Sequence, residues 1–325
     1  MANELNQRSV AMAAAVATDG VPNYTVAIPL FRNTDCVKVD GKKIDLAPLS
    51  ASLSKPGYLV GAKTCEFTPG LNLQGVETLT ATPTLWRLDS IFRACGWART
   101  TPGVGSLRLR MRSSGFETAR VLFSEVTEDG NAVKWDIPGT IGNLEISGTA
   151  GAEIQVSPTL KGVYVEPTTA AVAGTITTGN NTAEYMQNAP LTLTVQGGTP
   201  MTTVIAKSFK VNAGYEINDW TDFGSAEGIA SQRRSDRKPT HEIVVGMDYT
   251  KYIELLQAWS GGYSKRITAA FRQGVTVGAR ISFTLIGQLT NMPRGGEINL
   301  RTITLSFDGV PSSGATDDEY TIDLT

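Results

Sequence analysis

The sequence contains very little histidine and cysteine, which restricts the chemistry that it can support. Its 325 residues include one histidine, His241, and three cysteines, Cys36, Cys65 and Cys95. One histidine cannot build a zinc site of histidine and cysteine ligands, and a serine triad would depend on His241 at the start of a predicted strand. Three cysteines are too few, and odd in number, for a disulfide framework. We therefore expect a non-enzyme with no catalytic residue, no metal and no cofactor.

Signals for phosphate binding and glycoside hydrolysis are equally weak. Gly103-Val-Gly105 lacks the third glycine of a dinucleotide fingerprint, and the sequence has no Walker A loop. The carboxylate pairs Glu125 with Glu128 and Asp219 with Asp222 are the candidates for a glycosidase, which needs two acids at a defined separation. Acids in polar loops of this kind are usually solvated, so they do not change the expectation.

Charge and long apolar runs are also scarce. Lys and Arg number 29 against 31 Asp and Glu, a formal net charge of −2, and charged residues make up 18% of the chain, below the roughly 25% of an average domain. The basic footprint of a protein that holds nucleic acid along its length is absent. No apolar run approaches the ~20 residues that a bilayer requires, and segment 11–17 makes a poor signal peptide. We expect a protein that starts in a cytoplasm and whose surface meets other protein.

The sequence does contain a long series of short β-type segments separated by turn residues. Ser106 to Arg112 alternates strictly between apolar residues and Arg108, Arg110 and Arg112, which predicts a strand with one buried face. The even spacing of these β-type segments along the chain favours a β-sandwich or barrel. Further strands are predicted at 118–126, 141–146, 153–160, 191–195, 203–211, 242–247, 266–272, 280–289 and 299–307.

Two segments show helical periodicity instead. In 82–97, apolar residues recur on one helical stripe, Thr82-Pro83 is suited to the N-terminus, and Gly96 to the C-terminus. Segment 248–262 has the same kind of stripe, with Asp248 as a cap and Gly261 at the end. Both segments predict amphipathic helices.

The two helices lie in two halves that resemble each other. The helical stripes align at a constant offset, and Gly-Ala-Glu-Ile-Gln-Val at 151–156 matches Gly-Gly-Glu-Ile-Asn-Leu at 295–300. We interpret this as an internal duplication; the alternative is two unrelated β domains with coincidental helices. The predicted organisation is an N-terminal arm and loop region at 1–55, a first β domain at 56–166, a linker at 167–188, and a second β domain with an acidic C-terminal tail at 189–325.

Charged residues are concentrated in two complementary segments. Segment 233–238 holds four cations and segment 317–323 holds four acids. Such patches can orient one subunit on the next, or they can be two independently solvated loops. With the arginines of the strand at 106–112, the predicted subunit-interface residues are Arg108, Arg110, Arg112, Arg233, Arg234, Arg237, Lys238, Asp317, Asp318, Glu319 and Asp323.

Several stretches resemble the tail tube (major tail) proteins of long-tailed bacteriophages with non-contractile tails. Leu88-Asp-Ser-Ile-Phe-Arg-Ala-Cys-Gly-Trp97 is similar to the family's LLRACG helix, and Asp236-Arg-Lys-Pro-Thr-His-Glu-Ile243 to its TDRKPTG strand start. Segments 116–126 with 141–148, and 160–167 (LKGVYVEP), provide two further matches in the right order. The resemblance covers about residues 55 to 310 and departs from the family at Arg233-Arg234 and in the first 20 or so residues.

The resemblance implies a β-sandwich or barrel with a flanking helix, whose subunits close into rings that stack into a hollow tube for DNA. With a duplicated domain, three chains supply the six tube domains of a ring; with one domain per chain, six are needed. The implied partners are further copies of the chain, the tape measure, terminator and distal tail proteins, and double-stranded DNA in transient passage, with no membrane. The implied location is the virion tail, assembled in the host cytoplasm.

Because a conduit should not hold DNA, we expect Arg108, Arg110 and Arg112 to pair with carboxylates of adjacent subunits. The N-terminal arm and segment 41–56 lack strong periodicity, and we expect them to order only on ring stacking.

Two other protein classes remain open. One is a secreted β-sandwich adhesin or carbohydrate-binding module; the other is the tube protein of a contractile tail, a tail-derived bacteriocin or a secretion apparatus.

Overall fold

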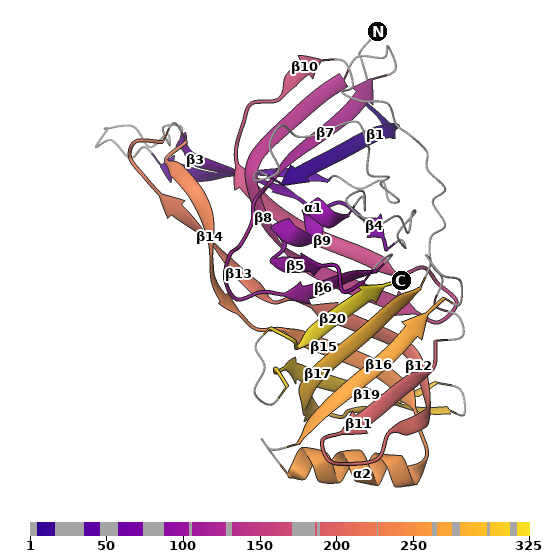
Figure 1. Cartoon of the computed structure of the whole chain (residues 1–325). Helices are drawn as coiled ribbons and strands as arrows, with labels where there is room; N and C mark the ends of the chain where they lie inside the picture. Colours follow the sequence, from indigo (N-terminus) through magenta and orange to yellow (C-terminus); the bar gives the residue numbers. More distant parts are fainter. Residues whose placement is uncertain are drawn as a thin grey trace, which may run out of the picture.

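Alternating apolar and polar residues place most of the described chain in antiparallel strands, which confirms the mainly β fold with a flanking helix (Figure 1). The structure is a computed structural model. It describes residues 5–16, 36–45, 58–73, 88–103, 106–127, 132–170, 186, 189–225, 227–261, 265–274, 280–297, 300–312 and 317–325.

The C-terminal half contains a closed β-barrel. Hydrogen-bonded pairing runs in the order β11–β16–β17–β19–β15–β12, and β12 returns to β11. These strands are β11 (Leu191–Val195), β12 (Met201–Asn212), β15 (Thr240–Gly246), β16 (Arg266–Gln273), β17 (Ile281–Asn291) and β19 (Leu300–Gly309). Phe209, Phe271 and Phe283 pack against one another inside, with ring centroids 4.8 to 5.1 Å apart. Because the barrel is closed, each of its six strands pairs with two neighbours, and none is an edge strand.

Helix α2 (Tyr249–Ser260) lies across one end of this barrel (Figure 1). It begins as predicted, because the Asp248 side chain accepts a hydrogen bond from the Lys251 amide at 3.0 Å. Leu255 and Ala258 are buried on its inner face. The predicted helix at 248–262 is therefore confirmed.

The N-terminal half repeats the same order of pairing. Its strands pair as β1–β7–β8–β9–β3–β2, and a helix follows β3 just as α2 follows β15. Within the described residues, β1 and β2 do not pair with each other, so this ladder is open. Its elements are β1 (Leu5–Val16), β2 (Val37–Asp45), β3 (Tyr58–Phe67), α1 (Asp89–Ala94), β7 (Ala119–Thr127), β8 (Ala132–Thr149) and β9 (Gln155–Val163). The shared order is the arrangement that the predicted duplication requires.

One set of strand pairs joins the two ladders, and a second set adds strands of the N-terminal half to the barrel, so that all of them belong to one continuous sheet. The end of β8 pairs with the end of β12, from Glu145↔Asn212 to Thr149↔Ser208. Strand β20 (Tyr320–Leu324) lies between β17 and β6 (Leu107–Met111). The shorter strands at the margins are β4 (Leu71–Asn72), β5 (Trp97–Thr100), β10 (Thr168–Ala170) and β18 (Arg294–Glu297).

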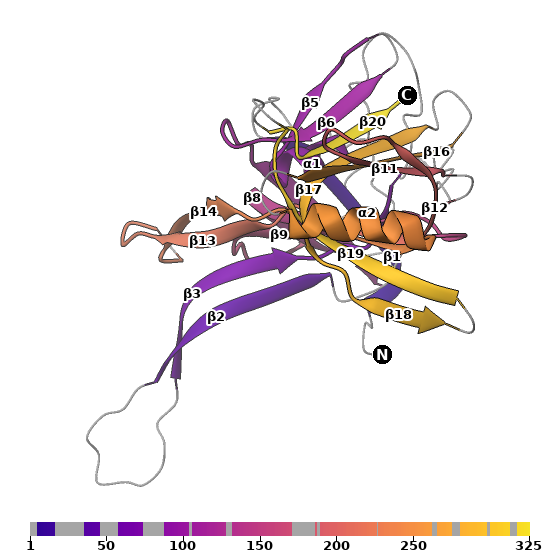
Figure 2. The ribbon, with the colours of Figure 1, turned by 90° about the horizontal axis from the view of Figure 1, so that it is seen from below.

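Two hairpins extend away from the body (Figure 2). One is formed by β2 and β3, and the other by β13 (Tyr215–Thr221) and β14 (Ile229–Arg237), which form a separate two-stranded sheet. They lie side by side, since Lys63 of β3 is 4.0 Å from Glu227 beside β14.

Parts of the structure differ from the sequence-based expectations. The region 1–55, predicted as arm and loop, contains β1 and β2, each held by hydrogen bonds to a neighbouring strand of the same chain. The predicted acidic tail ends in β20, whose Tyr320, Ile322 and Leu324 are buried; the acids before and within it conceal this alternation in the sequence. Helix α1 begins at Asp89, and the predicted cap at Thr82-Pro83 lies outside the described residues.

Candidate functional site

The charged residues selected from the sequence meet mainly where the two ladders join. Arg108 of β6 stands directly opposite Asp323 of β20 and donates two hydrogen bonds to its carboxylate, from Nε to Oδ1 and from Nη2 to Oδ2, the latter at 3.1 Å. This hydrogen bond raises the pKa of Arg108. The partner of Arg108 is thus a carboxylate of the same chain, whereas we expected one from an adjacent subunit.

The basic and acidic segments also meet within one chain. Arg237 of β14 binds Glu319 and lies 3.2 Å from Asp317. Burial lowers the pKa of Arg237, but its hydrogen bond to Tyr215 and the charge of Glu319 outweigh burial, so the net pKa is raised. Asp318 accepts a hydrogen bond from the Ser312 amide at 2.9 Å. The predicted complementarity therefore operates between β14 and the start of β20.

We call the contact region between the two halves, formed by Tyr215, Arg234 and their partners, the joint. Arg234 lies at its centre. Its guanidinium donates to the carbonyl oxygen of Ala94 at the end of α1 and lies 4.8 Å from the Phe116 ring centroid and 5.3 Å from that of Tyr215. Burial lowers the pKa of Arg234. A cation from the C-terminal half thus contacts Ala94 and Phe116 of the N-terminal half.

Tyr215, which follows Gly214 at the start of β13, completes the joint. Its hydroxyl lies 2.8 Å from the carbonyl oxygen of Gly96 and 2.7 Å from that of Arg112. Gly96 has φ of +82°, and a Cβ there would stand 2.5 Å from the Tyr215 ring. Sequence reasoning assigned no role to Tyr215, because an isolated tyrosine between turn residues carries no pattern that identifies its partner.

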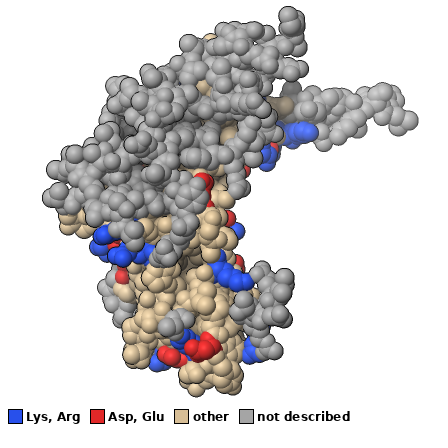
Figure 3. Space-filling model, turned by 90° about the vertical axis from the view of Figure 1, so that its right-hand side faces the viewer, with Lys and Arg blue, Asp and Glu red and all other residues tan. Residues whose placement is uncertain are grey.

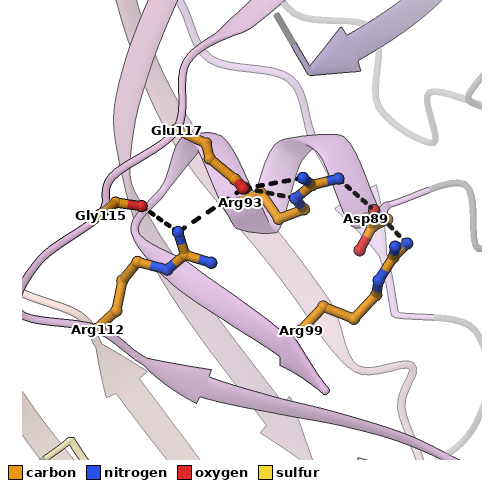
Figure 4. A network of polar contacts seen from close by, with 6 residues as sticks. All are labelled: Asp89, Arg93, Arg99, Arg112, Gly115 and Glu117. Carbon is orange, nitrogen blue, oxygen red and sulfur yellow. Dashed lines mark hydrogen bonds and ion pairs between the residues drawn. The ribbon is translucent and has the colours of Figure 1, made fainter. Parts of the chain in front are cut away.

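An ionic network supports the N-terminal side of the joint (Figure 4). Arg93 of α1 binds Glu117 and lies 3.4 Å from Asp89, which also receives a hydrogen bond of 2.8 Å from Arg99. Arg112 donates to the Gly115 carbonyl and lies 3.8 Å from Glu117. Asp89 and Arg93 are buried, so removing one partner would leave an uncompensated buried charge.

The remaining predicted interface residues lie outside the joint. Arg233 stacks on Trp220, with the guanidinium carbon 4.1 Å from the ring centroid. Lys238 is exposed and lies 3.4 Å from Asp236. Arg110 is exposed and has no ionic partner in the part of the chain that the structure describes.

Three side chains of types often used in catalysis, His241, Cys65 and Cys95, are buried and uncharged at neutral pH. His241 stacks on Phe307 inside the barrel, with Nδ1 3.1 Å from the Tyr320 hydroxyl, and burial lowers its pKa to about 3. Burial raises the pKa of Cys65 to about 11 and that of Cys95 to about 12, so neither is a thiolate at neutral pH. Among the described residues, no group of three or more histidines, cysteines and acids could hold a metal ion.

The candidate acid pairs are not assembled into a site by the described residues. Asp219 binds Lys161 at 2.9 Å, and Asp222 accepts a hydrogen bond from the Gly224 amide within its own turn. The side chains of Glu125 and Glu128 lie outside the described part. No described helix is long and apolar enough to cross a membrane. The contacts of Tyr215 and Arg234 with the N-terminal half fix the two β-ladders relative to each other.

Replacing Gly96 with alanine should destabilise the joint. The change forces a side chain into positive φ and against the Tyr215 ring, so the free energy of unfolding should fall by about 2–4 kcal/mol in urea titrations. Gly151 is the matched control, because it has φ of +78° and open space around it. Gly151→Ala should cost only about 1 kcal/mol. Equal losses in the two variants would contradict the role of the Tyr215 contact.

Acid should weaken the barrel through His241. Its pKa is below the ordinary value of 6.5 when folded, so its contribution to stability is complete above pH 6.5 and is lost as pH falls toward 3, at up to about 1.4 kcal/mol per pH unit. His241→Phe keeps the ring on Phe307 and removes the titration. Urea unfolding between pH 7 and 5 should show a smaller loss for the variant; the same loss in both proteins would contradict the prediction.

Comparison with known proteins adds no relative for this chain. No family model matches the sequence, and no curated protein is significantly similar to it. The functional interpretation therefore depends on the motifs of the sequence and the geometry of the fold.

Proposed function

We propose that this chain is the structural subunit of a tail tube, which assembles into rings that stack into a hollow conduit for DNA. One observation carries the proposal: among the described residues, two ladders have the same strand order, one closed on itself and the other open. A closed ladder can be stable alone, whereas an open ladder presents unpaired backbone groups at both edges. The open ladder is therefore the part of the chain suited to pairing with another subunit.

The outer edges of the open ladder are the flanks of β1 and β2. In the described chain, β1 pairs only with β7, and β2 only with β3. Edge strands of this length are hazards for uncontrolled aggregation unless a partner covers them. In a ring, the β1 edge of one subunit pairs with the β2 edge of the next, and the closed symmetry satisfies every edge.

The β2–β3 hairpin supports the same function. Strand β3 pairs with β9 only over Thr64–Phe67, which lie opposite residues 37–40 of β2, and the rest of β2 and β3 form a ribbon beyond the ladder (Figure 2). Val39 and Val60 are exposed on this hairpin. Isolated two-stranded ribbons are marginally stable in water. Contact with a neighbouring ring or subunit would stabilise this one.

The distribution of charge fits a conduit through which DNA slides. The face in Figure 3 shows mostly uncharged atoms over the described part of the barrel. Arg108 and Arg237 have carboxylate partners, and the net charge of −2 provides no basic excess. Since each unpaired cation facing DNA adds salt-dependent affinity, this balance limits retention.

The repeated ladder also supports a trimeric form of the proposed ring. Three chains with two ladders each supply six ladders per ring, a pseudo-hexamer built from a trimer. The remaining partners in this proposal are the tape measure, terminator and distal tail proteins, which would contact the ends or the lumen of the stack.

Electron microscopy of the purified full chain over a range of concentrations tests the function. We expect stacked rings with a central pore wide enough for double-stranded DNA, and threefold symmetry in ring averages. Compact monomers at the highest concentration would contradict the tube. Sixfold averages with one chain per repeat would keep the tube but contradict the trimer.

A further inference from the structure

We propose that Phe223, at the tip of the β13–β14 hairpin, inserts into an apolar pocket on the barrel of a second copy of this chain. This inference rests on the proposed function, because it names one contact by which subunits assemble. Both surfaces are present on every chain, so each copy can supply one knob and receive another.

The hairpin tip carries a large exposed aromatic side chain. Phe223 is fully exposed, and Trp220, three residues earlier, is about half exposed at 53%. The turn itself is shaped by Asp222, which accepts a hydrogen bond from the Gly224 amide at 3.2 Å. Trp220 lies near the end of β13 with Arg233 stacked on its ring. Phe223 is therefore the aromatic residue of the turn itself, and its exposed ring offers a large area that a partner can bury.

The pocket forms where β12 changes from one neighbouring strand to another. Strand β12 pairs with β11 at Met201 and Val204 and with β8 from Ser208 onward. Between these two pairings, Ile205 and Ala206 pair with neither β11 nor β8, and a cavity of about 450 Å³ opens there. Its apolar lining includes Met186, Leu191, Val204, Ile205, Phe209 and Phe271.

The size and exposure of this pocket suit an aromatic guest. Ile205 on its wall is 70% exposed, although isoleucine is among the residues most often buried. The volume lies within the range of pockets that enclose small organic groups. Filling it with the Phe223 ring would cover Ile205 and the exposed ring together.

Charge complementarity favours a second copy as the occupant. Asp222 precedes Phe223 at the tip, and Lys207 is the charged residue in the pocket wall. The described part of the surrounding barrel face in Figure 3, seen from the side of β11 and β12, is largely uncharged. The turn carries two acids, Asp222 and Glu227, beside its aromatic group, and the pocket wall carries one cation, so the charges of the two surfaces are opposite in sign.

The chain cannot fill its own pocket. In Figures 1 and 2, the β13–β14 hairpin extends to one side of the molecule while β11 and β12 lie on the other. The contact is therefore heterologous, joining different surfaces of two copies. Contacts of this kind generate closed rings or open helical stacks, which are the assemblies that the proposed function requires.

Cysteine crosslinking tests the contact directly. The native cysteines are all buried, so Phe223→Cys and Ile205→Cys each introduce one accessible thiol. Under mild oxidation, a mixture of the two variants should form a disulfide-linked dimer, and either variant alone should form much less. Tyr249→Cys on α2 is the control, because Tyr249 is about as exposed as Ile205, and it should not crosslink with Phe223→Cys.

A second measurement keeps the test independent of disulfide geometry. Phe223→Ala should raise the concentration needed for assembly by about tenfold or more, as expected for loss of an aromatic anchor. Phe223→Trp should assemble like the wild type, and so should Tyr249→Ala. If the wild type forms tubes, yet no crosslink appears and Phe223→Ala assembles normally, the contact is wrong and the function stands. If the wild type never self-associates, both are wrong.

Discussion

The side chain of Tyr215 leaves the C-terminal half of the chain and enters the N-terminal half, where its hydroxyl reaches the carbonyl oxygens of Gly96 and Arg112. This insertion requires a glycine at position 96, because no side chain fits between that backbone and the tyrosine ring. Arg234 and Arg237 of the neighbouring strand then acquire partners on the N-terminal half and on β20. Buried polar groups need such partners to be tolerated, so these contacts fix the relative position of the two ladders.

A fixed joint matters because the two ladders differ in one respect. The C-terminal barrel has closed and satisfies its own backbone, while β1 and β2 end the N-terminal ladder without pairing to each other in the described chain. If the joint were loose, the edges of the open ladder would have no defined direction. Because the joint holds the open ladder in place, the edges of this ladder have one fixed direction, which a subunit of a symmetric ring requires.

Sequence patterns predicted the parts of this structure that depend on local periodicity. Leu107, Leu109 and Met111 alternate with arginines and are buried in β6, and Asp248 caps α2. The β13–β14 hairpin was missed because most of its residues are exposed on both faces, so it shows no alternation. Charge complementarity indicated that the basic and acidic segments attract each other. It could not indicate that they meet in one chain, because that depends on the long-range pairing of β20 with β6.

Amide hydrogen exchange on β1 and β2 tests the central claim, that the open ladder is completed by another subunit. Exchange measured by mass spectrometry would compare dilute, unassembled protein with the assembled form. The account predicts that residues 5–16 and 37–45 gain protection on assembly, while β16 and β17 inside the closed barrel exchange equally slowly in both forms. Unchanged exchange of β1 and β2 in assembled protein would contradict it.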